Sequence, residues 1–214
     1  MMGQLSLERL APLAGIGFAV LLLAGRLLVW SYPDADAPAG EAVSFWSDKD
    51  DKLIAVSILG SLSAALFVWF GGSIREAIRR AEGGGGRLAA LTFGGALLTA
   101  AVILIEESLV FTTAETAGKV PDGVTQTMSA LQADFFLPFI AGFLVFLLAA
   151  GIGVLRTGVL PRWVGWSAVV IAVLWVLPNP GVIFLTFLWV AAVSVLLFVS
   201  EDDTREEQAS VQPA

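Results

Sequence analysis

The chain has 214 residues, of which 57% are hydrophobic and only 14% are charged, and its mean hydropathy is +0.84. Soluble domains are about 45–50% apolar and about 25% charged, so this composition indicates an integral membrane protein. The net charge of −7 argues against nucleic-acid binding. The chain has no cysteine and no histidine, which excludes disulfides, thiolate metal sites, histidine-ligated haem and catalysis by a cysteine nucleophile or a histidine base. We therefore expect no enzymatic activity, no cofactor and no metal site.

Hydrophobic runs follow one another along the chain, most of them near the ~20 apolar residues that cross a bilayer. The six runs cover residues 10–30, 53–72, 88–111, 134–155, 162–177 and 181–199. Lipid offers the backbone no hydrogen-bond partner, so each run is predicted to be a helix. The expected fold is an all-α polytopic membrane protein with six transmembrane helices in one domain, residues 1–200. The fifth run is short and residues 178–181 (PNPG) turn into the sixth, so these two runs form either a hairpin that just spans or a re-entrant hairpin.

Basic residues near the span ends predict the orientation of the chain. If all six runs cross, eight arginines lie on one side and three lysines on the other: Arg9, Arg75, Arg79, Arg80, Arg87, Arg156, Arg162 and Arg205 against Lys49, Lys52 and Lys119. Cytoplasmic loops carry the excess of basic residues, so both termini are placed in the cytoplasm of a bacterial plasma membrane. Cleavage of a signal peptide near residues 35–37 is the competing interpretation, but the first apolar run continues to Trp30, which is long for such a peptide.

The connecting segments carry further helical patterns. Residues 73–82 (SIREAIRRAE) continue the second span, with Glu76 spaced to pair with Arg80, until the glycines at 83–86 end the helix. Apolar residues at 124, 128 and 131 predict a helix ahead of the fourth span, which Pro138 should bend. Ser47 and Asp50 resemble a capping box that opens the second span. Residues 201–214 are polar and acidic, and we predict a disordered cytoplasmic tail.

Arg26 is the basic residue that lies inside an apolar run, and it gives the best indication of function. An arginine at a helix centre in lipid costs about 2.5–3.5 kcal/mol, so it needs a partner, a wet cavity or a nearby interface. Counted from Ala11 and Leu91, Arg26 and Glu106 both lie 15 residues deep, about 22 Å at 1.5 Å per residue. We therefore predict an Arg26–Glu106 ion pair in an intramembrane polar cluster that includes Glu107 and Asp134. The alternatives are that the acids lie in the headgroup layer and that Arg26 extends toward the interface.

Small residues recur every four positions in the first three spans, where they let helices approach closely. They are Ala11, Gly15 and Ala19, then Ser57, Ser61 and Ala65, then Gly95 and Thr99. Packing within the chain is the preferred interpretation, and a face for a partner is the alternative.

Two stretches, residues 67–98 and residues 155–174 (LRTGVLPRWVGWSAVVIAVL), contain recurring motifs. These are an aromatic helix end before arginine, a glycine run before Arg-Leu, and an LPRW-x-GW sequence, carried by Trp69, Arg75, Arg87, Pro161, Arg162, Trp163, Gly165 and Trp166. In these motifs the chain resembles a group of small six-span membrane proteins of actinobacteria and related GC-rich bacteria. The resemblance implies six spans with both ends inside, and it implies no activity or catalytic residues.

Two functions fit the sequence. The first is a non-enzymatic membrane protein of the lipid bilayer that packs against a second copy or another membrane protein. The second is a small-solute transporter or a substrate-binding membrane subunit that uses the Arg/Glu cluster in the outer half of the bundle. Whether Arg26 faces a cavity distinguishes the two.

Overall fold

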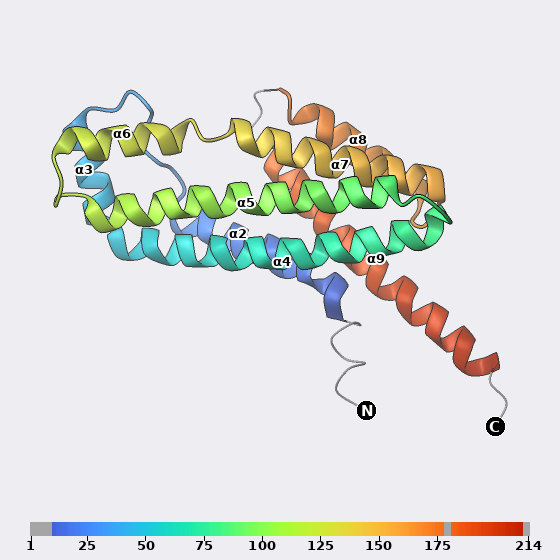
Figure 1. The fold of residues 1–214 in the computed structure, drawn as a ribbon. Coiled ribbons are helices and arrows are strands. Elements are labelled where there is room, and N and C mark those ends of the chain that lie inside the picture. The colour runs from blue at the N-terminus through green and yellow to red at the C-terminus, as the bar shows by residue number, and fades with distance from the viewer. Residues whose placement is uncertain (1–9, 178–180, 212–214) are drawn as a thin grey trace.

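The structure, a computed structural model, describes residues 10–177 and 181–211, with side chains described up to Ser200 (Figure 1). Within this part of the chain every regular element is a helix. In chain order the helices are η1 (Ala11–Leu13), α2 (Ala14–Leu28), α3 (Ala39–Asp48), α4 (Asp50–Glu82), α5 (Arg87–Thr116), α6 (Asp122–Ala133), α7 (Leu137–Thr157), α8 (Arg162–Leu174) and α9 (Val182–Val211). The predicted all-α class is thus confirmed.

Five helical segments of the described chain are long and apolar enough to cross a membrane: Ala11–Leu28, Asp50–Glu82, Arg87–Thr116, Asp122–Thr157 and Val182–Ser200. They correspond to the first four predicted runs and the sixth. The fifth run forms α8, whose 13 residues measure about 20 Å at 1.5 Å per residue. The protein is therefore a multi-pass helical membrane protein, and its six spans and cytoplasmic termini stay predictions. The division at residue 200 and the disordered tail after it also stay predictions, although the backbone of α9 continues as a helix to Val211.

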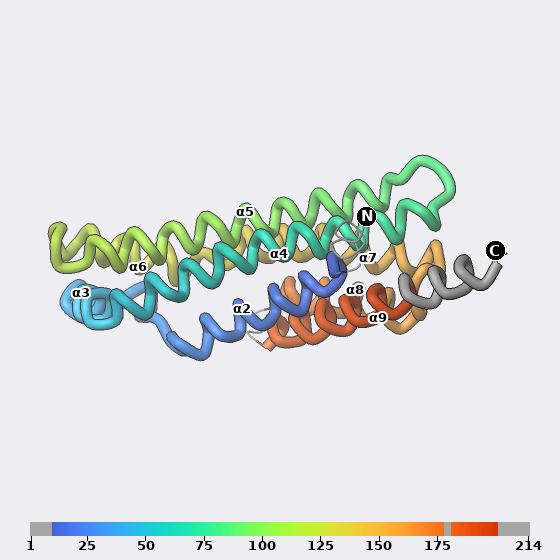
Figure 2. Tube along the Cα trace, turned by 90° about the horizontal axis from the view of Figure 1, so that it is seen from below, coloured from blue at the N-terminus to red at the C-terminus, as the bar shows by residue number. Residues whose placement is uncertain are grey.

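Six helices pack side by side into a closed ring. α4 contacts α2 and α5, α7 contacts α5 and α8, and α9 contacts α8 and α2 (Figures 1 and 2). A cluster of buried aromatic rings fills one half of this ring. Phe67 lies at its centre, with ring centroids 4.5 Å from Phe18 and 4.9 Å from Phe146. Burying such large side chains together supplies the main apolar core of the bundle.

Small residues bring these helices close together. Gly15 of α2 faces Ser194 of α9, Gly71 of α4 faces Ala96 of α5, and Gly95 of α5 lies against the backbone of Phe146 in α7. The interpretation as packing within the chain therefore holds for Gly15 and Gly95. The predicted stripe on α4 is wrong beyond Ser57, because Ala65 is exposed and the buried small residues are Gly60, Ser63, Ala64 and Gly71.

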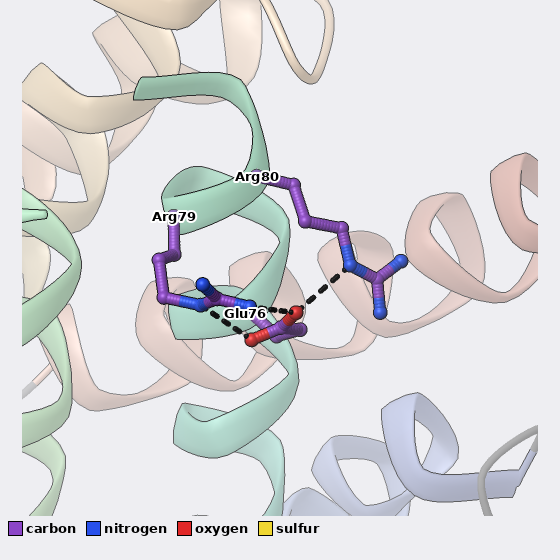
Figure 3. A network of polar contacts seen from close by, with 3 residues as sticks. All are labelled: Glu76, Arg79 and Arg80. Atoms are coloured by element: carbon purple, nitrogen blue, oxygen red, sulfur yellow. Dashed lines mark hydrogen bonds and ion pairs between the residues drawn. The ribbon is translucent and has the colours of Figure 1, made fainter. Parts of the chain in front are cut away.

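At one end of the bundle, α4 continues past the apolar run as predicted. Glu76 pairs with Arg80 at 2.9 Å and also with Arg79 at 2.8 Å (Figure 3). Gly83 then ends α4 with a left-handed backbone, φ 61°, which glycine adopts without strain. The Glu82 carboxylate accepts hydrogen bonds from the backbone N–H groups of Leu88 and Ala89, each at 3.2 Å, and so satisfies the first turn of α5.

At the other end, α3 packs on α4, α5 and α6, and α6 also packs on α5; we call this assembly the head (Figure 1). The head has a second apolar core, centred on Trp46 of α3, whose side chain is fully buried. α6 is the helix predicted ahead of the fourth span, but the apolar residues that predicted it do not form its buried face. Val124 and Leu131 are exposed, and the buried residues are Thr125, Ser129 and Gln132. The break before Leu137 places Pro138 in the first turn of α7. The sequence analysis missed α3. The predicted capping box is wrong, because Ser47 lies inside α3 and donates its hydroxyl to the carbonyl oxygen of Val43.

Candidate ligand-binding cavity

A cavity of about 920 Å³ lies within the helix ring on the side of the head. Ligand-binding pockets have volumes of about 300–1,000 Å³, so its size suits a small molecule. Its polar wall consists of Arg26, Tyr32, Asp34, Glu106, Glu107, Gln132 and Asp134. Its apolar wall includes Leu21, Leu22, Ile103, Phe139, Ile140, Trp175, Val182, Ile183 and Phe187. Apolar walls with a few convergent polar groups are typical of binding sites.

The cavity exists because the ring helices differ in length. α2 ends at Leu28, α8 ends at Leu174 and α9 begins at Val182, whereas α4 and α5 continue into the head. The aromatic cluster around Phe67 fills the ring next to the cavity, and Phe187 belongs to both. Trp30 at 70% and Phe136 at 54% exposure also line the cavity, which shows that it opens to the surface of the protein.

The structure brings all four residues of the predicted polar cluster to the wall of this one cavity. Arg26 lies in the last turn of α2, where its positive charge also suits the helix C-terminus. Glu106 and Glu107 lie near the middle of α5, and Asp134 follows the end of α6. Arg26 and Asp134 are exposed, Glu106 is half-buried and Glu107 is only 7% exposed.

The predicted Arg26–Glu106 ion pair is not formed. In the part of the chain with described side chains, no Arg26 nitrogen lies within 4.0 Å of a carboxylate oxygen, and Arg26 acts on Glu106 and Glu107 over a longer distance. α2 packs on α4 and α9 and is separated from α5. Arg26 and Glu107 also lie at different depths along the bundle. Gly25, next to Arg26, faces Val56 of α4, whereas Glu107 faces Gly60 on the same helix. Arg26 therefore lies about one helical turn, roughly 5 Å, nearer the head than Glu107.

Glu107 occupies a notch on α4. Gly60 has no side chain, and a Cβ atom built there would overlap the Glu107 carboxyl group and lie 2.7 Å from its Cγ. The carboxyl group is thus held at the α4–α5 interface, at the wall of the cavity. Its Oε2 atom is buried and has no hydrogen-bond partner in the described part of the chain. A buried carboxylate oxygen without a donor is costly, which makes this position a candidate contact for a ligand.

Sequence reasoning missed three other polar members of the wall. Gln132 of α6 lies next to the Glu106 carboxyl group, and its own Oε1 is buried without a partner. Burial raises the pKa of the Tyr32 phenol, and the neighbouring Glu107 raises it further, so Tyr32 stays protonated and can donate a hydrogen bond. Trp175 donates its Nε1–H to Thr186 at 3.0 Å and stacks on Phe143. The helical period that predicted α6 placed Gln132 on a helix, but it did not show what that residue faces.

The chain matches no family model, and neither the curated proteins nor the solved structures include a significant match to it. Inferences about function therefore rest on the cavity and its residues.

Proposed function

We propose that this protein binds a small amphiphilic solute in the cavity, as a transporter or as the substrate-binding membrane subunit of one. The observation that carries the proposal is the position of Arg26, Glu106, Glu107 and Asp134 on the wall of one cavity of about 920 Å³ whose other wall is apolar. Charged residues inside membrane bundles are expensive, and they commonly mark the path of a substrate. The proposal involves no catalysis, since the sequence has no cysteine, no histidine and no recognisable arrangement of a nucleophile and a base.

The other function that fits the sequence is packing against a second copy or another membrane protein, and the small residues of the spans were one candidate face for it. Gly15, Gly71 and Gly95 are instead used for contacts between helices of the same chain. This favours the solute-binding function, and it leaves open that two copies associate through other surfaces.

The proposed setting is a bacterial plasma membrane crossed six times, with both termini in the cytoplasm. α2 begins and α9 ends on the same side of the molecule, which an even number of crossings requires (Figure 1). α8, although short, is the fifth crossing in this arrangement. The arginines at 75, 79, 80, 87, 156 and 162 then face the cytoplasm, and the head faces outward. The resemblance to six-span proteins of GC-rich bacteria is consistent with this orientation.

Native mass spectrometry of the gently solubilised protein tests the proposal. We expect a fraction of the molecules to carry one small molecule from the host membrane or medium. Ala133→Trp places a large side chain at the cavity wall and should remove that adduct. Leu131→Trp, on the same helix at an exposed position outside the cavity, should retain it. An adduct that is absent from the wild type, or equally abundant in the Ala133→Trp protein, would refute solute binding in the cavity.

A further inference from the structure

The charges on the cavity wall indicate the kind of solute it accepts. Four acidic residues, Asp34, Glu106, Glu107 and Asp134, line the cavity, and Arg26 is the only basic residue among its lining residues. A bound cation would balance this excess, whereas an anion would add to it. In the described part of the chain, no group of three or more acidic, histidine or cysteine side chains is arranged to hold a metal ion. The excess charge beside an apolar wall therefore suits a cation with an apolar, organic body.

Two buried atoms at this wall lack hydrogen-bond donors. They are Oε2 of Glu107 and Oε1 of Gln132, and each belongs to a side chain that is only 7% exposed. The amide oxygen of Gln132 is always an acceptor, and the Glu107 carboxyl oxygen is an acceptor when the acid is ionised. A cationic ligand that completes both atoms must therefore donate hydrogen bonds and hold Glu107 in its ionised form. An ammonium group donates up to three hydrogen bonds. A hydrogen bond between an ammonium group and a carboxylate is charge-assisted and therefore strong.

The position of Glu107 is fixed from the other side by Gly60, whose missing side chain leaves room for the carboxyl group. The remainder of the wall is apolar and aromatic. Trp175 is held by its hydrogen bond to Thr186 and by its stacking on Phe143 at 4.8 Å between ring centroids. Aromatic faces attract cations, and the apolar wall accepts a hydrocarbon body.

From these observations we propose that the solute is a lipophilic amine, bound as its ammonium cation against Glu107 and Gln132 with its apolar body along the Trp175 wall. This inference rests on the proposed function and specifies its ligand class. Arg26, about one turn nearer the head, then repels a second cation and leaves room for one amine.

Three probes with the same eight-carbon chain test the ligand class: octylamine, octanol and octanoate. Their binding to the purified full-length protein in detergent is measured by native mass spectrometry and by the shift in melting temperature. We expect octylamine to bind at least about tenfold more tightly than octanol, and octanoate to bind most weakly. Glu107→Gln should weaken octylamine binding about tenfold or more, while Glu115→Gln, an exposed glutamate on the same helix, should leave it unchanged.

Gln132→Leu provides a second test should the Glu107 variant fail to fold. It should weaken octylamine binding more than octanol binding, because it removes one acceptor and keeps the side-chain size. Preferred binding of octanol or octanoate that Ala133→Trp abolishes would overturn the amine assignment and retain the proposed function. Octylamine binding that neither Glu107→Gln nor Gln132→Leu weakens would also overturn the assignment. If none of the three probes binds, both the amine assignment and the proposed solute-binding function are contradicted.

Discussion

Replacing Gly95 with alanine is expected to destabilise the protein strongly. A Cβ atom at this position would lie 2.5 Å from the backbone nitrogen of Phe146 and 2.6 Å from its Cα. Backbone atoms in the middle of α7 cannot move aside as a flexible side chain can, so α5 and α7 must separate. Overpacking of this kind costs about 1–3 kcal/mol, and Gly95→Val should cost more. The measurement is the melting temperature of the purified protein in detergent.

Gly94 is the matched control for this prediction. It is the preceding residue of α5, it is exposed, and a Cβ atom there would meet nothing within 4 Å. Alanine has a higher helix propensity than glycine by up to about 1 kcal/mol, so Gly94→Ala should leave the melting temperature unchanged or raise it. Equal losses at the two positions would show that α5 and α7 do not meet at Gly95.

Truncating Trp46 to alanine should unfold the head while the helix ring stays folded. Trp46 is fully buried in the head core with Val29, Leu53 and Val110, and this core is a cluster separate from the aromatic core of the ring. Loss of a buried tryptophan costs about 3–5 kcal/mol. Hydrogen exchange should therefore rise throughout α3 and α6.

Trp69→Ala serves as the comparison, because Trp69 is 60% exposed on α4 and contributes little to either core. It should leave exchange in the head unchanged. If Trp46→Ala instead increased exchange equally in α5 and α7 beside Phe67, the head and the ring would be one cooperative unit.

The long helices were predictable because lipid imposes one requirement on every spanning segment, internal backbone hydrogen bonding, and the apolar runs show where it applies. The ends of the helices were less predictable. α4 begins before its apolar run, at Asp50, where α3 packs against it in the head. α3 was missed because residues 31–52 contain no long apolar run, whereas Trp46 and Ala42 on one face bury it against the head core.

The cavity residues were predicted from the energetic cost of charges in lipid, and that reasoning named Arg26, Glu106, Glu107 and Asp134. It did not give their distances. A depth count from assumed membrane edges placed Arg26 level with Glu106, because the sequence shows neither which helices are neighbours nor that α2 is displaced by about a turn. Gly60 was missed for a related reason, since the four-residue spacing of Ser57, Ser61 and Ala65 selected a different face of α4.

The central claim is that the bundle contains a wet polar cavity on the side of the head. Cysteine labelling tests it most directly, because the chain has no cysteine of its own. Glu106 lines the cavity, whereas Leu104, two residues earlier on α5, is 45% exposed on the protein surface outside the cavity, where lipid should cover it. A water-soluble, membrane-impermeant thiol reagent added to intact cells should therefore label Glu106→Cys at least about tenfold faster than Leu104→Cys. Gly84→Cys, between α4 and α5, should react only after permeabilisation. Equal protection of the cysteines at 106 and 104 would contradict the cavity, and labelling of the cysteine at 84 in intact cells would contradict the orientation.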